Sequence, residues 1–124
     1  SLDFLRKAYL GGDVDSVMKV LSSGSLEKIK NMNRLFASMS QEQAASLAAR
    51  YGLPEQKLRS MTTRDGVILV MFLDPERNSL ARALKSNPVS HARRDKAMVF
   101  RMANGTDLLF VREGPYWKLD MTDL

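Results

Sequence analysis

Residues 96–121 read KAMVFRMANGTDLLFVREGPYWKLDM, and this stretch decides the fold. It contains three short apolar runs that are separated by two turn signals. The first signal is Asn104-Gly105, which favours a type I′ hairpin turn because both central positions of that turn need a positive φ. The second is the Glu-Gly-Pro run at 113–115, in which Pro115 is expected to begin the third strand because proline cannot donate to a ladder. The pattern predicts an antiparallel meander.

The alternation of side chains predicts which face of the meander is covered. In the first run Met98, Phe100 and Met102 share one face, since successive residues of a strand point to opposite sides. The middle run, 108–111, is apolar on both faces and suits a central strand. In the third run the residues that share a face are Trp117, Leu119 and Met121. The upstream residues must therefore supply a layer that covers this apolar face.

Helical periodicity dominates the chain before residue 88. Apolar residues recur at helical spacing over 2–10, 14–21, 26–36 and 41–50, and a short turn is expected near 55–61. Asp13 is the expected N-cap of the second helix, and Ser25 is the expected cap of the third. Ser40 with Gln43 forms a capping-box pattern, and Gly52 suits the position after a helix end.

Residues 67–73, Val-Ile-Leu-Val-Met-Phe-Leu, are ambiguous. Their β-branched content favours a buried strand. The cap signal that begins at Thr63 and the Asp74-Pro75 stop favour a buried helix, which we prefer, although periodicity alone does not decide. Residues 75–86 then predict an amphipathic helix that Asn87-Pro88 closes, and 89–93 predict a short leading strand. The inward residues of the 75–86 helix are expected to be Leu80, Ala83 and Leu84.

The predicted fold class is α+β, with N-terminal helices packed on one face of a C-terminal antiparallel β-meander of three to four strands. A chain of 124 residues fits one domain. We therefore expect a single α+β domain over 1–124, with a helical part at 1–87 and a sheet part at 88–124.

The composition excludes several classes of site. The chain has no cysteine, which excludes disulfides, thiolate nucleophiles and cysteine-ligated zinc. The net charge is +5, and the densest basic cluster, Arg93, Arg94 and Lys96, supplies candidate anion contacts. The other basic residues are scattered among acids, so nucleic acid is not an expected partner.

No apolar run approaches the ~20 residues that a transmembrane helix needs. No signal peptide is recognised, and the cytoplasm and an extracytoplasmic compartment of a bacterium both fit.

Few residues suggest catalysis. His91 is the only histidine, and the nearest downstream carboxylate, Asp95, lies four residues away, a spacing that fixes no geometry outside a helix. One histidine without cysteine leaves only carboxylates for a metal. The acidic residues near the hairpin and the C-terminus form no calcium-binding loop: they are Asp107, Asp120 and Asp123. We predict no catalytic residue, no metal site and no cofactor.

Two short motifs lie at the ends of the chain. The first is Ala8-Tyr9-Leu10-Gly11-Gly12-Asp13 followed by the helical run at 14–21, and the second is FVREGPYWKL at 110–119. The first resembles the opening helix, Gly-Asp step and second helical turn of NTF2-like domains, the cystatin-like α+β cones. The second is similar to their closing hairpin, in which Arg-Glu, a glycine-containing turn and Trp-Lys follow one another. The resemblance implies a curved sheet that wraps a helix and leaves a pocket. In the family such pockets serve hydration, isomerisation or ligand binding, and other members oligomerise or bind proteins.

These observations predict a non-enzymatic NTF2-like domain that binds a small apolar ligand or a protein partner through its sheet. A homodimer through an apolar sheet face is also expected, because an open apolar face needs covering. One alternative is a pocket enzyme with acid–base chemistry of the isomerase or dehydratase kind, using carboxylates or tyrosines. A weaker alternative is association of the basic cluster with nucleic acid or anionic lipid. The residues expected to line the pocket or interface are Met98, Phe100, Met102, Tyr116 and Trp117.

Overall fold

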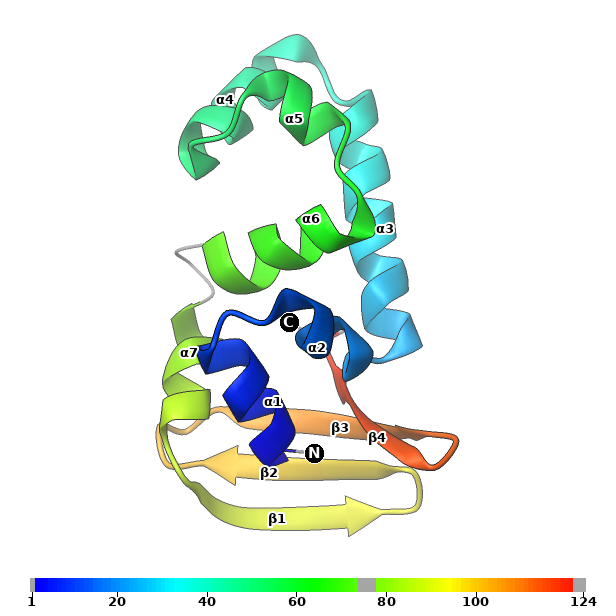
Figure 1. The fold of residues 1–124 in the computed structure, drawn as a ribbon, viewed down its shortest axis with the longest axis vertical. Coiled ribbons are helices and arrows are strands. Elements are labelled where there is room, and N and C mark those ends of the chain that lie inside the picture. The colour runs from blue at the N-terminus through cyan, green and yellow to red at the C-terminus, as the bar shows by residue number, and fades with distance from the viewer. Residues whose placement is uncertain (1, 74–77, 122–124) are drawn as a thin grey trace.

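The computed structural model describes residues 2–73 and 78–121, which form helices followed by a sheet (Figure 1). The helices are α1 (Leu2–Leu10), α2 (Val14–Lys19), α3 (Ser23–Ser38), α4 (Gln41–Tyr51), α5 (Glu55–Arg59), α6 (Thr63–Ile68) and α7 (Asn78–Lys85). A π-helical turn, η1 (Leu69–Leu73), continues α6 directly. The strands are β1 (Pro88–Arg94), β2 (Ala97–Met102), β3 (Asp107–Glu113) and β4 (Tyr116–Asp120).

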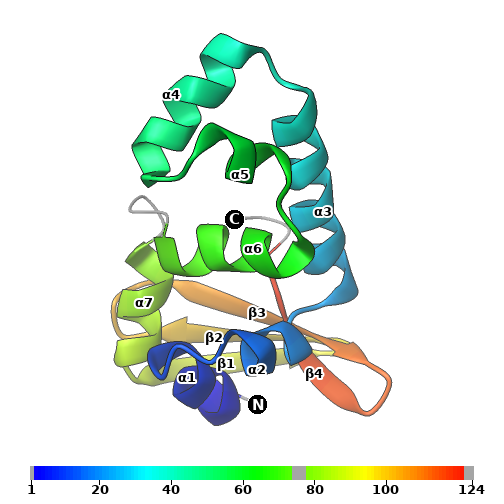
Figure 2. The same ribbon diagram turned by 45° about the horizontal axis from the view of Figure 1, so that its top comes forward.

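The four strands form one antiparallel sheet in the order β1-β2-β3-β4. The helices lie on only one face of this sheet (Figures 1 and 2). The predicted α+β class is therefore confirmed, and the expected leading strand is β1. The covered face carries the apolar side chains that the alternation predicted. Met102, Phe110 and Leu119 are each at most 1% exposed there.

The β2–β3 hairpin does not turn as predicted. Gly105 has a φ of +88°, but Asn104 is not among the described residues with a positive φ, so the turn is not type I′. The N–H of Gly105 donates to the Met102 carbonyl at 2.9 Å, and the N–H of Met102 donates to the Thr106 carbonyl at 2.9 Å. These bonds enclose a three-residue loop that ends in a left-handed glycine, which is the next most common hairpin connection.

The β3–β4 hairpin turns at Gly114 and Pro115, so the strand begins one residue later than predicted, at Tyr116. Gly114 has a φ of +61°, which fits the first central position of a two-residue hairpin turn. Glu113 pairs with Tyr116 across this turn. Pro115 has no N–H, and its place in the turn keeps it out of the ladder.

Residues 67–73 are helical, as preferred from the sequence. The cap is Thr62, one residue before the expected position: its Oγ1 accepts from the Asp65 N–H at 3.1 Å, and the Asp65 carboxylate accepts from the Thr62 N–H at 3.0 Å. Most side chains of residues 67–73 are buried, including Val67 and Met71, so polar and apolar residues do not alternate in this run. The expected stop at 74–75 lies outside the described residues. In α7 the inward residues are those predicted: Leu80, Ala83 and Leu84.

Most other helix ends follow from local signals. The Asp13 carboxylate caps α2 by accepting from the Ser16 N–H at 3.2 Å. Ser40 caps α4 by accepting from the Gln43 N–H at 3.2 Å, and Gly52 ends that helix at a φ of +68°. The exception is α3, because its N-cap is Ser22 and not Ser25.

Two buried serines bond the start of α3 to the end of β4. Ser22 and Ser25 are each 1% exposed, and their hydroxyl oxygens are 2.8 Å apart. Ser22 Oγ donates to Asp120 Oδ1 at 2.7 Å. Ser25 Oγ accepts from the Met121 N–H at 2.7 Å. Buried polar groups that bond in this way fix one arrangement, because each group would cost free energy if it lost its partner.

The backbone continues the same contact. The N–H of Ser22 donates to the Leu119 carbonyl at 2.8 Å, and the N–H of Leu119 donates to the Val20 carbonyl at 2.6 Å. Residues 20–22 thus run beside β4 as a short parallel bridge centred on Leu21 and Leu119. We call the contact of residues 20–25 with residues 119–121 the serine junction. It joins the helical part of the chain to the sheet.

The apolar side chains form one main core and one satellite. The main core lies between the sheet and the helices around α1, α2, α6 and α7. The satellite, built on Ala44, Ala48 and Leu58, lies under α4 and α5. Helix α3 contributes to both. It packs closely on α6 at Gly66, where an added Cβ would lie 2.5 Å from Ile29 Cγ2.

Replacing Ser25 by alanine is expected to lower the free energy of unfolding by about 1–3 kcal/mol, because the Met121 N–H and the Ser22 hydroxyl each lose a buried partner. Urea unfolding followed by circular dichroism measures the loss. The matched control is Ser46→Ala on the exposed side of α4, which should change stability by less than about 0.5 kcal/mol. Equal effects of the two substitutions would contradict a stabilising junction.

Candidate functional site

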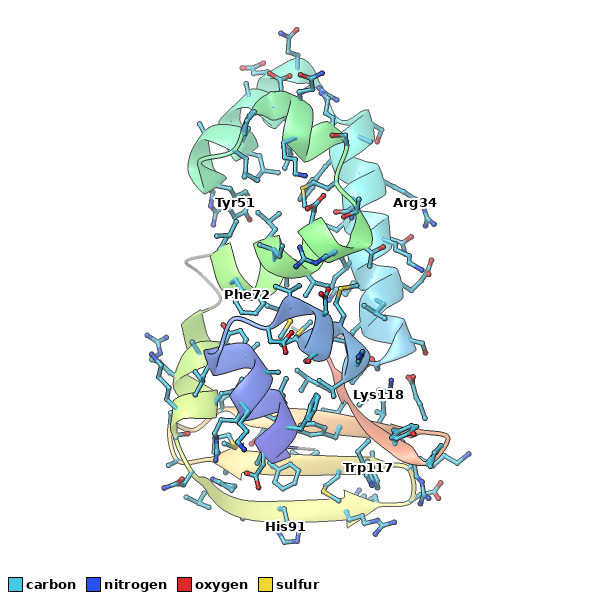
Figure 3. The ribbon with its side chains drawn as sticks, in the orientation of Figure 1. Arg34, Tyr51, Phe72, His91, Trp117 and Lys118 are labelled. Carbon is cyan, nitrogen blue, oxygen red and sulfur yellow. The ribbon has the colours of Figure 1, made fainter. Side chains whose placement is uncertain are left out.

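Trp117 marks a part of the sheet that the helices cover incompletely. It lies on β4 opposite Arg112 of β3, and it shares the helix-facing side of the sheet with Leu119. Its side chain is only half-buried. Figure 3 shows Trp117 and Lys118 toward the β3–β4 hairpin. In the described part of the chain, hollows lie on both sides of Trp117, and they are lined by Trp117 or by Arg93, whose guanidinium lies over its ring.

The first hollow, which we call the aromatic groove, has a volume of about 680 Å³. Its walls include two large side chains that are unusually exposed, Tyr116 at 67% and Phe4 at 49%. Lys118 Nζ donates to the Lys19 carbonyl at 2.6 Å and so ties β4 to the end of α2. The lining comes from α1, from the end of α2 and from the β3–β4 hairpin: Phe4, Lys19, Val20, Pro115, Tyr116, Trp117 and Lys118.

The second hollow is smaller, with a volume of about 270 Å³, and we call it the sheet hollow. Phe100 packs edge-on against Phe110 in it, with ring centroids 5.6 Å apart. Asp3 is the charged residue of its lining. The start of α1 and the inner face of the sheet supply the residues: Leu2, Asp3, Met98, Phe100, Phe110 and Trp117.

The third hollow is a basic cleft of about 680 Å³ between the β1–β2 and β3–β4 turns. The guanidinium of Arg93 lies 5.3 Å from the centroid of the Trp117 ring, a cation–π contact that connects this cleft to Trp117. Arg112 Nε donates to the Gly114 carbonyl at 3.1 Å. Three cations face one carboxylate, so the cleft attracts anions. Its lining is Arg93, Asp95, Lys96, Arg112 and Gly114.

The structure distributes the predicted site residues among these hollows. Tyr116 and Trp117 line the aromatic groove, and Met98 and Phe100 line the sheet hollow. Met102 shares the face of Met98 and Phe100, but it is 1% exposed and belongs to the main core. The helices therefore cover this strand at its Met102 end and leave it partly open at its Met98 end.

The predicted anion contacts separate in the same way. Arg93 and Lys96 line the basic cleft. Arg94 follows Arg93 along β1 and therefore points to the opposite face of the sheet. Arg112, the third cation of the cleft, was not predicted as an anion contact, although the sequence carries a signal for it. Arg112 lies on the same face as Phe110 and Leu108 in an apolar strand, and an arginine on that face requires a polar or open environment.

Among residues 2–73 and 78–121, the groups with displaced pKa values lie outside all three hollows. Burial raises the pKa of the Tyr9 phenol, whose O–H donates to the Met71 carbonyl at 2.5 Å. Hydrogen bonds at helix N-termini lower the pKa of Asp13 and of Asp65. A hydrogen-bonded carboxylate raises the pKa of Arg101. These four groups act as a core anchor, two caps and a surface ion pair.

Residues 2–73 and 78–121 contain neither a metal-binding cluster of side chains nor a helix that could span a membrane. No group of three or more metal-ligating side chains gathers within these ranges. None of the helices described there is long and apolar enough to cross a membrane. His91 is exposed on β1, with its ring 6.0 Å from the ring of Phe100.

Comparison with known proteins gives no relative: no protein-family model, curated protein or solved structure matches the chain.

The Tyr9 phenol gives a pH-dependent prediction. Its folded pKa is raised above the ordinary value of 10.0, so its contribution to stability is present below pH 10.0 and is lost as the pH rises further. Tyr9→Phe should cost about 1 kcal/mol of unfolding free energy at neutral pH, where the bond to Met71 is lost. Urea unfolding of both proteins should show this difference shrinking above pH 10.0. A difference that grows with pH would contradict the assignment.

Proposed function

We propose that the chain is a non-enzymatic binding domain of the NTF2-like kind, which takes a small ligand with an apolar body and an anionic group into the aromatic groove. The observation that carries the proposal is the lining of that groove, where aromatic and aliphatic side chains stand beside two lysines. Sites for small ligands combine an apolar lining with a few polar groups in this way.

The charges of the groove select an anion. Lys118 uses one N–H of its ammonium group on the Lys19 carbonyl, and an ammonium has two more to donate. The Arg93 guanidinium over Trp117 extends the positive potential toward the basic cleft. A carboxylate, sulfonate or phosphate on the ligand would therefore gain from both sides of Trp117, whereas a cationic ligand would be repelled.

The groove is held in shape by bonds within the protein. The Val20 carbonyl accepts from the Leu119 N–H, and Lys118 bonds across to the end of α2. The bond between Val20 and Leu119 is part of the serine junction, and the residues of the Lys118 bond directly precede the junction in both segments of the chain. A site whose walls are already fixed loses less conformational entropy when it binds, so more of the contact energy appears as affinity.

The placement of the two motif segments supports the NTF2-like part of the proposal. The motif near the N-terminus and the closing hairpin motif are far apart in the sequence. They meet in the structure, where residues 20–22 run beside β4 and where Val20 and Tyr116 line the same groove. Both motifs thus belong to one structural unit, which contains the groove.

The second binding partner that we propose is a protein, and one candidate is a second molecule of this chain. The outer face of the sheet carries Val99, Leu109 and Val111, which are half-buried, and none of the described helices lies on that face (Figure 2). Two such faces would cover one another's apolar side chains. Acid–base catalysis has less support, because the displaced pKa values in the described part of the chain belong to groups outside the hollows.

The test uses 8-anilinonaphthalene-1-sulfonate, which has an apolar ring system and one anionic group. Trp117 is the only tryptophan, so quenching of its emission reports a probe bound beside it. We expect saturable quenching by the probe, and about fivefold weaker binding in Tyr116→Ala, because the exposed ring supplies an aromatic contact.

The control is Leu35→Ala on α3, since Leu35 has the same 67% exposure as Tyr116 but lines none of the hollows. Its affinity for the probe should equal that of the unsubstituted protein. Equal weakening by both substitutions, or quenching that does not saturate, would show general adsorption to apolar surface and would overturn the proposal.

A further inference from the structure

The sheet has one partly closed edge and one open edge. Residues 20–22 cover the β4 edge at Leu119. The other edge is β1, whose seven residues are all exposed. Figure 1 shows no described element beyond this strand. An open edge presents backbone N–H and C=O groups that can pair with another strand.

The hydrogen bonds of the central strands identify those groups. The Arg112 N–H donates to the Lys96 carbonyl at 2.8 Å, and the Met102 N–H donates to the Thr106 carbonyl at 2.9 Å. The even-numbered residues of β2 therefore bond to β3, and the odd-numbered residues bond to β1, since the two directions alternate along a strand. Their partners in β1 are Ser90, Ala92 and Arg94.

The backbone groups of His91 and Arg93 therefore point away from the sheet. A strand pairs with its neighbour through the N–H and C=O groups of alternate residues, in antiparallel and in parallel ladders. His91 and Arg93 are two such alternate residues. The edge at this point is open to solvent on both sides of the strand, because every β1 side chain is exposed. Figure 3 places His91 on β1 at the boundary of the molecule.

The edge is poorly suited to pairing with a second copy of itself. Arg93 and Arg94 lie on it, Pro88 begins it, and the register shifts between Pro88 and Ser90. Charged side chains, proline and bulges are the devices by which proteins prevent edge-to-edge association of their own sheets. A partner with the opposite charge would not meet this barrier.

The charge around the edge selects an acidic partner. Arg93 reaches from β1 into the basic cleft, where Lys96 and Arg112 also lie, and Asp95 is the one carboxylate of that lining. Arg94 adds a positive charge on the opposite face. A strand laid along β1 would place alternate side chains on the two faces, so acidic residues on it would meet cations on both.

We propose that β1 is the docking strand for an acidic, extended segment of a partner protein, which adds to the sheet as a fifth strand. Its main chain pairs with the N–H and C=O groups of His91 and Arg93. One acidic side chain enters the basic cleft between Arg93, Lys96 and Arg112. Strand addition of this kind takes affinity from main-chain bonds and specificity from the side-chain sites. The two sites share the neighbourhood of Arg93, whose guanidinium lies over Trp117, but the backbone groups of His91 and Arg93 that pair with the added strand are on β1, which contributes no residue to the lining of the aromatic groove.

The experiment uses the whole protein, labelled with ¹⁵N, and an end-blocked peptide that alternates glutamate and threonine. We expect binding to slow hydrogen exchange of the His91 and Arg93 amides by at least about tenfold, because these N–H groups become bonded. The Ser90 and Ala92 amides, which already bond to β2, should change little. A peptide with lysine in place of glutamate should not bind.

Two matched variants separate main-chain pairing from charge attraction. His91→Pro removes an outward N–H without removing a bond to β2 and should weaken the glutamate peptide about tenfold or more. His91→Ala keeps that N–H and should change the affinity by less than about threefold. Three results would each overturn the proposal. The glutamate peptide binds without slowing the exchange of the His91 and Arg93 amides, or a peptide N-methylated at its pairing amides binds equally well. The third is that the glutamate peptide does not bind at all.

Discussion

The contact between the start of α3 and the end of β4 is polar, and it is buried. Ser22 and Ser25 are almost inaccessible, and their hydroxyls bond to one another, to Asp120 and to the Met121 backbone. An apolar contact would tolerate sliding of the helix along the strand, but these bonds are satisfied in one register only. The serine junction therefore fixes how the helical part of the chain sits on the sheet, and the rest of the structure is arranged from it.

The site around Trp117 is a consequence of that placement. Because residues 20–22 are bonded beside β4, the end of α2 lies against Lys118, and the aromatic groove forms between them. The helices then cover Met102 and Phe110 but leave Trp117 half-buried, with Arg93 stacked on its ring. The junction also covers the β4 edge at Leu119, which leaves β1 as the open edge. The aromatic groove and the difference between the two edges of the sheet thus have the same structural origin.

Features set by neighbouring residues were predictable from the sequence, and features set by distant ones were not. The strands followed from alternation, and the caps at Asp13 and Ser40 followed from residue type. Loop length at Asn104-Gly105 depends on the register of two strands, so the dipeptide alone indicated the wrong turn. Ser22 and Ser25 are equivalent by type, and only the contact with β4 distinguishes the cap. Alternation placed Met102 on the right face without showing how far the helices extend over it.

The role of the serine junction is tested most directly by native-state hydrogen exchange of individual amides at increasing urea. The reference is the amide of Phe110, which is fully buried on a central strand, so we expect it to exchange only when the whole protein unfolds. If the junction joins helices and sheet into one cooperative unit, the Ser22, Leu119 and Met121 amides exchange with the same opening free energy as Phe110. Exchange of these three amides through a smaller opening, while Phe110 stays protected, would show that the helical part detaches from an intact sheet and would contradict the account.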